Sequence, residues 1–268
     1  MNKSFDISSS SLHIIAMVLM LCDHICMTLL NNKVWLHLIG RASFPIFAFM
    51  AVEGYYHTKD LKKYLLRLFV FALIAEVPFD LMCAGIFVYP FQQNALFTYI
   101  FGILGILVID QTKKIKSSFV KYPVFALTAI LMWIVMFVLG QITMVDYFGG
   151  GIVMILSFYL FREDRLFSFK IEYKEKWMSV CMRIINMIMQ FALVYYIAAE
   201  MISGLCYNVV IFGRTYELVA ESLGVFALIP IWLYRGRKGI DSKAFKYFCY
   251  AFYPLHIALL VLIHHIIY

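Results

Sequence analysis

The chain has 268 residues, of which 63% are hydrophobic and 15% are charged, and its mean hydropathy is +0.84. A soluble domain carries about a quarter charged residues and about half apolar residues. This composition excludes a soluble globular enzyme. It predicts an all-α, polytopic integral membrane protein, in which residues 1–268 form one transmembrane domain.

Apolar stretches long enough to cross a bilayer follow one another along the whole chain. A helix needs about 20 such residues to span the hydrocarbon core. The first stretch has no small-residue cleavage signature, so we expect a retained anchor and not a removed signal peptide. We predict about nine transmembrane helices, within a range of about eight to ten, and residues 200–215 are difficult to place. The predicted spans are 11–30, 36–57, 64–84, 94–110, 122–140, 145–161, 178–199, 216–234 and 247–267.

Positive residues cluster after alternate spans, and their position matters more than the net charge of +7. The intervening loops hold chiefly Lys33 and Arg214. Because cytoplasmic loops are enriched in Lys and Arg, the pattern predicts a cytoplasmic N-terminus in a multi-pass bacterial plasma-membrane protein. We expect the lipid bilayer as surroundings and no nucleic-acid partner. The basic clusters lie within residues 59–63, 113–121, 162–176 and 235–246.

Ionisable residues interrupt the first two spans. Asp23 and His24 lie in a run of otherwise apolar residues, and Arg41 lies in the next span. A charge at membrane depth costs a few kcal/mol, and such residues commonly mark functional sites. Neighbouring helix positions point about 100° apart. We therefore expect Asp23 to pair with another span and not with His24.

The predicted topology sorts the intramembrane polar residues into two layers, at 1.5 Å of rise per helical residue. One layer holds the candidate catalytic residues Asp23, His24, Arg41, Glu76 and Asp80, with His256 near the middle of the last span. The other layer lies near the cytoplasmic boundary. A path could connect the two layers. The members of the second layer are His13, Glu53, His57 and Arg67.

Structural explanations compete with functional ones for several of these residues. Arg41 could form an ion pair with Asp23, Glu76 or Asp80 that holds helices together. His256 could be a packing residue. Side chains near the boundary, among them Glu53, His57 and Arg67, could extend toward water without any other role.

The chain resembles the TraX family over several short motifs, most densely in roughly its first 110 residues. The resemblance identifies the chain as a member of a family of integral membrane proteins associated with N-terminal acetylation of conjugative pilin. These proteins are distantly similar to transmembrane acyltransferases. The motifs are Leu12–Ala16 with Asp23-His24, Ile39–Phe49, Val52–Thr58, Lys63–Arg67, Ala75–Asp80, Asn94–Thr98 and Tyr253–His256.

The resemblance implies a role for the first span. In the transmembrane acyltransferases this span carries a basic residue, ten further residues and then a catalytic histidine. His24 matches that histidine, and His13 occupies the basic position, where arginine or lysine is expected. The implied reaction transfers an acyl group, expected to be acetyl, from cytoplasmic acetyl-CoA to an acceptor in the cell envelope.

Each candidate residue has an expected part in this acyltransferase. His24 would be the general base or a transient acyl carrier. Arg41 would orient an acid or stabilise the oxyanion. The tautomer of His24 would be held by Asp23, Glu76 or Asp80. The cofactor-binding residues would be His13, Glu53, His57, Lys63 and Arg67, with Lys59 and Lys62 also meeting the CoA phosphates.

Two other functions stay open at this point. A proton- or ion-coupled transporter would use the same intramembrane Asp, Glu, His and Arg residues. A non-catalytic assembly factor would use them only to hold helices together. The acceptor could be pilin, a glycan or a peptide, and the sequence predicts no metal site.

Overall fold

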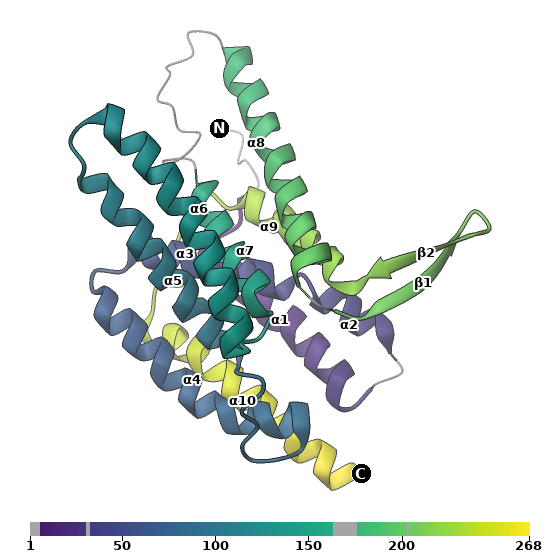
Figure 1. Ribbon diagram of the computed structural model, residues 1–268. Helices are drawn as coiled ribbons and strands as arrows, with labels where there is room; N and C mark the ends of the chain where they lie inside the picture. The colour runs from purple at the N-terminus through teal and green to yellow at the C-terminus, as the bar shows by residue number, and fades with distance from the viewer. Residues whose placement is uncertain (1–5, 31–32, 163–175, 203) are drawn as a thin grey trace.

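Helices make up most of the structure, a computed structural model that describes residues 6–30, 33–162, 176–202 and 204–268 (Figure 1). The prediction of a helical bundle is confirmed, with one β-hairpin as the exception. The α-helices of the described residues are α1 (Ser9–Thr28), α2 (Val34–Gly40), α3 (Ser43–His57), α4 (Leu61–Ala84), α5 (Ala95–Gln111), α6 (Ser118–Thr143), α7 (Phe148–Leu160), α8 (Lys176–Tyr196), α9 (Leu228–Leu233) and α10 (Lys243–Ile267).

Six helical segments are long and apolar enough to cross a membrane. α4 has 24 residues and is also long enough to span, but it carries Arg67, Glu76 and Asp80. The structure therefore supports a membrane protein with at least six candidate spans among the described residues, and the predicted count of about nine is not confirmed. The six segments are Ser9–Thr28, Val34–His57, Ala95–Lys114, Ser118–Thr143, Val180–Met201 and Lys243–Ile267.

Helix α7 is the central helix of the bundle and is too short to span a bilayer by itself. Its 13 residues measure roughly 20 Å along the axis, against about 30 Å of hydrocarbon. It packs against α3, α5 and α6, and its residues from Gly149 to Tyr159 are buried. A Cβ atom on Gly149 would lie 2.2 Å from the carbonyl oxygen of Phe137, so the glycine allows α6 and α7 to approach closely.

The segment after α8 departs from the prediction. A π-helix η2 (Ile197–Met201) is followed by an antiparallel hairpin of β1 (Cys206–Ile211) and β2 (Arg214–Val219), which extends away from the bundle (Figure 1). The hairpin turn places Phe212 at φ 51° and Gly213 at φ 74°. Two consecutive residues with positive φ are typical of a tight type I′ turn.

The predicted span over 216–234 is therefore wrong in its first residues. Residues 216–219 belong to β2, and a 3₁₀-helix η3 (Ala220–Ala227) precedes the short helix α9. The physical reason is local, because β-branched residues at Val209, Val210 and Thr215 and the turn at Gly213 favour a hairpin. A 3₁₀-helix η1 (Thr112–Lys114) completes the elements.

Several basic loops meet at one end of the bundle. Arg162 Nε lies 3.5 Å from Glu53 Oε1, and Arg237 Nε lies 3.2 Å from Asp6 Oδ2. The N–H of Ser9 donates to the carbonyl oxygen of Arg237 at 2.8 Å. That this end faces the cytoplasm stays a prediction. Residues 163–175, which include Arg165, Lys170 and Lys174 of the basic clusters, lie outside the described residues.

Candidate functional site

A cavity of about 560 Å³ extends along α1 and joins two groups of polar side chains. Ser9 lines one end and His24 the other. These residues are 15 positions apart, which is roughly 22 Å along a helix. Apolar and aromatic side chains line the middle: Met20, Phe44, Phe47, Met50, Leu68 and Tyr99. We call the end lined by His13, His57, Arg67, Lys238 and Lys246 the basic end, and the end lined by Asp23, His24, Ser43 and Asp146 the deep end.

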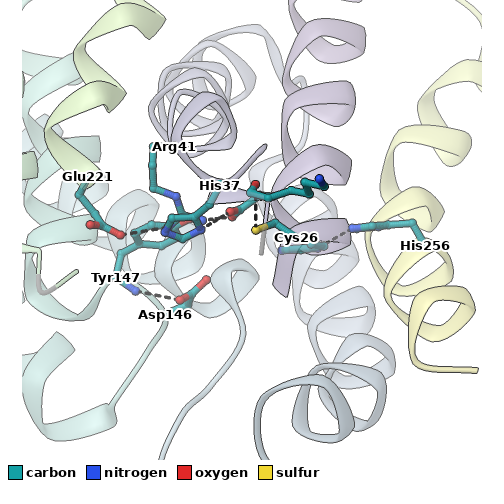
Figure 2. Close-up of polar contacts among 10 residues, drawn as sticks. Cys26, His37, Arg41, Asp146, Tyr147, Glu221 and His256 are labelled. Atoms are coloured by element: carbon teal, nitrogen blue, oxygen red, sulfur yellow. Dashed lines mark hydrogen bonds and ion pairs between the residues drawn. The ribbon is translucent and has the colours of Figure 1, made fainter. Parts of the chain in front are cut away.

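Two histidines meet at the deep end. His24 Nδ1 on α1 lies 2.7 Å from His256 Nε2 on α10, with the rings parallel to within 2°. His256 Nδ1 lies 2.6 Å from the carbonyl oxygen of Phe252. Figure 2 shows His256 extending from α10 toward α1. His24 lines the cavity and His256 lies behind it, so His24 is the ring that can meet a bound molecule.

Asp23 points into a buried network on the other side of α1. It forms an ion pair with Arg41, and its Oδ1 accepts a hydrogen bond from His37 Nδ1 at 2.8 Å. Arg41 Nη1 also donates to Glu221 Oε1 at 3.1 Å (Figure 2). The expectation that Asp23 pairs with another span is confirmed. Buried charges need such partners, because an unpaired ion in the interior is costly.

A break in the second predicted span creates this network. Residues 36–57 were expected to form one helix, but α2 ends at Gly40 and α3 begins at Ser43, with Arg41 in the turn between them. A Cβ atom on Gly40 would lie 2.4 Å from Asp23 Cβ, so glycine allows α2 to approach α1 at this point. The close approach brings the Arg41 guanidinium to the Asp23 carboxylate.

The connection between α6 and α7 supplies another acid at the deep end. Asp146 lines the cavity, and its carbonyl oxygen accepts a hydrogen bond from Thr98 Oγ1 at 2.6 Å. Met144, Tyr147 and Phe148 around it all have positive φ. Non-glycine residues in this region are strained, and such strain commonly occurs at functional sites.

Lysine and arginine side chains from α4 and the α9–α10 segment line the basic end. Arg67, Lys238, Lys243 and Lys246 are among its lining residues. Nε of Arg67 is buried and makes no hydrogen bond within the described part of the chain. The segment is held against α1, because the side chain of Ser10 accepts a hydrogen bond from the Ile240 N–H at 3.0 Å.

The predicted lysine contacts lie elsewhere. Lys63 is exposed and forms a pair with Asp60 at 3.2 Å, outside the cavity lining. The backbone N–H and ammonium of Lys63 hold the pKa of Asp60 below its usual range. Lys59 and Lys62 are also exposed and do not line the cavity.

Glu53 and His57 form a pair at the basic end. Glu53 Oε2 is 3.2 Å from His57 Nε2 and also accepts a hydrogen bond from the Tyr234 hydroxyl at 3.2 Å. Both residues and His13 line the cavity, and His13 Nδ1 donates to the Ser9 carbonyl oxygen at 2.9 Å. The predicted second layer of polar residues therefore lines one end of a continuous space.

Glu76 and Asp80 are separate from this cavity. Glu76 accepts a hydrogen bond from the side chain of Asn94, and Asp80 Oδ2 accepts one from the Tyr89 N–H at 2.9 Å. Neither residue is among those that line the cavity. Their contacts hold the connection between α4 and α5, so the structure does not bring them to Asp23 or His24.

Sequence inspection missed Asp146, which lines the deep end, and also His37 and Glu221, which belong to the buried network around Asp23 and Arg41. Asp146 and Glu221 both fall within predicted spans, 145–161 and 216–234, so the rule that an ionisable residue in a span marks a site could have identified them. His37 lies in the predicted span that follows the span of Asp23, so the same rule could have identified it. Among the described residues, no group of three or more His, Cys, Asp or Glu side chains could hold a metal ion.

Comparisons with known proteins place this architecture in context. A family model described as "TraX protein" matches residues 8–264. The chain is 25% identical over 277 aligned positions to "Probable fimbrial assembly protein FimC, serogroup H1" of Dichelobacter nodosus, and the match covers 97% of each chain. No solved structure matches.

Proposed function

The chain belongs to the TraX family, and from this premise we propose that it is a membrane-embedded acyltransferase. Acyl-CoA, with acetyl-CoA as the expected donor, enters at the basic end, and the acceptor meets His24 at the deep end. The observation that carries the proposal is the cavity, which joins a cluster of cations to a histidine through an apolar middle. Its volume of about 560 Å³ lies within the usual range of small-molecule sites.

The basic end suits the phosphates of CoA. Arg67, Lys238 and Lys246 can donate charge-assisted hydrogen bonds to phosphate oxygens. The thioester arm then extends past Glu53 and His57 toward the deep end, as the order of lining residues along α3 allows.

His24 is the base in the proposed reaction. The acceptor amine or hydroxyl attacks the thioester carbon, and its proton passes to the imidazole of His24. The carbon–sulfur bond of the tetrahedral intermediate breaks, and the CoA thiolate takes the proton from His24. A route in which His24 itself carries the acyl group uses the same geometry.

Arg41 has a supporting part in this proposal. Its guanidinium is already paired with Asp23 and Glu221, so it holds the two acids and α2 in place. Glu76 and Asp80, which lie outside the cavity lining, have no step in the reaction.

The relative from Dichelobacter nodosus favours a protein acceptor. It is named as a probable fimbrial assembly protein, and a fimbrial or pilin subunit has a terminal amine that could accept an acetyl group. We therefore propose such a subunit as the first acceptor to test, ahead of a glycan or a small peptide. The membrane in question is the bacterial plasma membrane.

Label transfer from acetyl-CoA tests the proposal. Purified protein in lipid nanodiscs is incubated with radiolabelled acetyl-CoA and envelope fractions, and the labelled product is identified. The His24→Ala variant should lose transfer by about 10²- to 10⁴-fold, the range that a positioned base contributes. His265→Ala is the matched control, because His265 is an exposed histidine near the end of α10. Absence of both CoA binding and transfer in the wild type would refute the proposal.

A proton- or ion-coupled transporter is the second candidate. The buried network of Asp23, His37, Arg41 and Glu221 is the observation in its favour, since intramembrane acids and histidines can relay protons. A transporter mechanism gives no role to the cations at the basic end of the cavity. Proton-coupled uptake into proteoliposomes, without acetyl transfer, would favour it.

A further inference from the structure

We propose that His256 fixes the tautomer of His24 and thereby makes Nε2 of His24 the atom that receives the acceptor's proton. The catalytic consequence rests on the proposed acyl transfer. The hydrogen positions themselves follow from the contacts of the two rings and can be tested without any reaction. His256 is a positioning residue in this proposal, because it lies behind His24 and not on the cavity wall.

The tautomer of His256 is set by the backbone of its own helix. Its Nδ1 lies 2.6 Å from the carbonyl oxygen of Phe252, and a carbonyl oxygen can only accept a hydrogen bond. Nδ1 of His256 therefore carries the hydrogen. A neutral imidazole has one N–H, so Nε2 of His256 has a lone pair and accepts.

The tautomer of His24 follows from that of His256. His256 Nε2 lies 2.7 Å from His24 Nδ1, so Nδ1 of His24 must carry the hydrogen of this bond. Nε2 of His24 is then the nitrogen with the lone pair. None of the described residues hydrogen-bonds to this nitrogen, and the ring lines the cavity. A substrate in the cavity therefore meets an unprotonated nitrogen.

A doubly protonated His256 would reverse the direction of the bond, but its surroundings oppose that state. None of the described carboxylates pairs with either ring, because the nearby Asp23 directs its oxygens to His37 and Arg41. Both rings are buried, at 9% exposure for His24 and 6% for His256. An unpaired cation in such a place is costly, so the neutral pair is the stable one.

This arrangement differs from the usual catalytic histidine, which is oriented by a carboxylate. At membrane depth a carboxylate facing His24 would need its own counter-charge. A neutral imidazole orients the ring without that requirement. The sequence predicts that Asp23, Glu76 or Asp80 holds the tautomer of His24. In the present proposal His256 has this role instead.

Nitrogen NMR on the intact protein, labelled with ¹⁵N-histidine in nanodiscs, tests the hydrogen positions. In the wild type, the two-bond hydrogen–nitrogen pattern of His24 should show a protonated Nδ1 and an unprotonated Nε2. In His256→Leu the Nε2-protonated form should appear, because the acceptor for Nδ1 is gone. A wild-type His24 protonated at Nε2, or a pattern unchanged in His256→Leu, would overturn the proposal.

Kinetics test the consequence. His256→Leu should lower kcat by about 10²-fold, at the lower end of what a general base contributes, with KM for acetyl-CoA unchanged. His256→Gln should restore much of kcat, because its amide oxygen can accept from Nδ1 of His24. If His256 only held the helices together, His256→Leu would not lower kcat at an unchanged KM, and His256→Gln would not restore kcat.

His264→Leu is the matched control on the same helix. His264 Nδ1 donates to the Thr28 carbonyl oxygen at 2.8 Å, so it too ties α10 to α1. The control should keep the wild-type kcat. If His256→Leu keeps full kcat while the wild type transfers acetyl, the positioning role is refuted and the proposed function stands. If the wild type transfers nothing, the proposed function fails, and NMR still decides the tautomer.

Discussion

Arg41 is the residue on which the buried network depends most. Its guanidinium is shared by the carboxylates of Asp23 and Glu221, and the side chains of all three are less than a tenth exposed. The three residues come from α1, the α2–α3 turn and η3, and η3 is far from the other two in the sequence. The same ion pairs can therefore hold the fold together and shape the deep end, so the structural and functional explanations of Arg41 do not compete.

Replacement of Arg41 tests how much its ion pairs contribute to the stability of the fold. Arg41→Met leaves two buried carboxylates without a counter-charge, so we expect the free energy of unfolding to fall by about 3–5 kcal/mol. The measurement is denaturant unfolding in micelles, followed by circular dichroism. Lys63→Met removes an exposed pair with Asp60 and should leave the free energy of unfolding nearly unchanged. Equal losses in the two variants would contradict the assignment.

At the scale of elements, the apolar pattern predicts where helices lie better than where they break. The span predicted over 36–57 coincides with Val34–His57, yet the chain turns at Arg41 between α2 and α3. Hydropathy averages over a window and does not detect one turn, which is stabilised by contacts with distant residues. For the same reason the predicted span over 216–234 includes residues 216–219, which belong to β2.

Glycine at position 40 should be essential for that break. Gly40→Ala puts a methyl group 2.4 Å from Asp23 Cβ, so α2 has to move away from α1. We expect a destabilisation of about 1–3 kcal/mol, typical of overpacking, together with a loss of acetyl transfer. Unfolding and label transfer are measured in parallel. Ile39→Ala, at the exposed neighbouring position, should leave transfer intact, and a Gly40→Ala variant with wild-type values would refute the close approach.

At the scale of the whole molecule, the direction in which a polar residue points could not be predicted from its level along a helix. The rise per residue predicts one level for Asp23, His24 and Arg41, and the structure pairs Asp23 with Arg41 while His24 contacts His256. Glu76 and Asp80 share that predicted level but contact Asn94 and Tyr89 on the α4–α5 side. The rotation of each helix about its axis decides such contacts, and it depends on packing between spans.

One cavity joins the basic end to the deep end, so the two ends should be separable in function. Neutralising Lys238 and Lys246 together, by Lys238→Gln and Lys246→Gln, should weaken CoA binding by roughly tenfold, because each lysine can contact a phosphate. KM for acetyl-CoA should rise while kcat stays the same. Raising the salt concentration should weaken CoA binding to the wild type more than to the variant, since the lost contacts are the screened ones.

The matched control separates this basic end from the lysines that the sequence pointed to. Lys62→Gln with Lys63→Gln removes the same charge from exposed positions outside the cavity lining. If CoA reaches His24 through the cavity, titration calorimetry should give wild-type affinity for this control and reduced affinity for the Lys238 and Lys246 pair. The opposite ranking would mean that CoA approaches along the outer face of α4, and the path through the basic end would then be wrong. Because both pairs lower the net charge equally, a general electrostatic attraction cannot produce the expected difference.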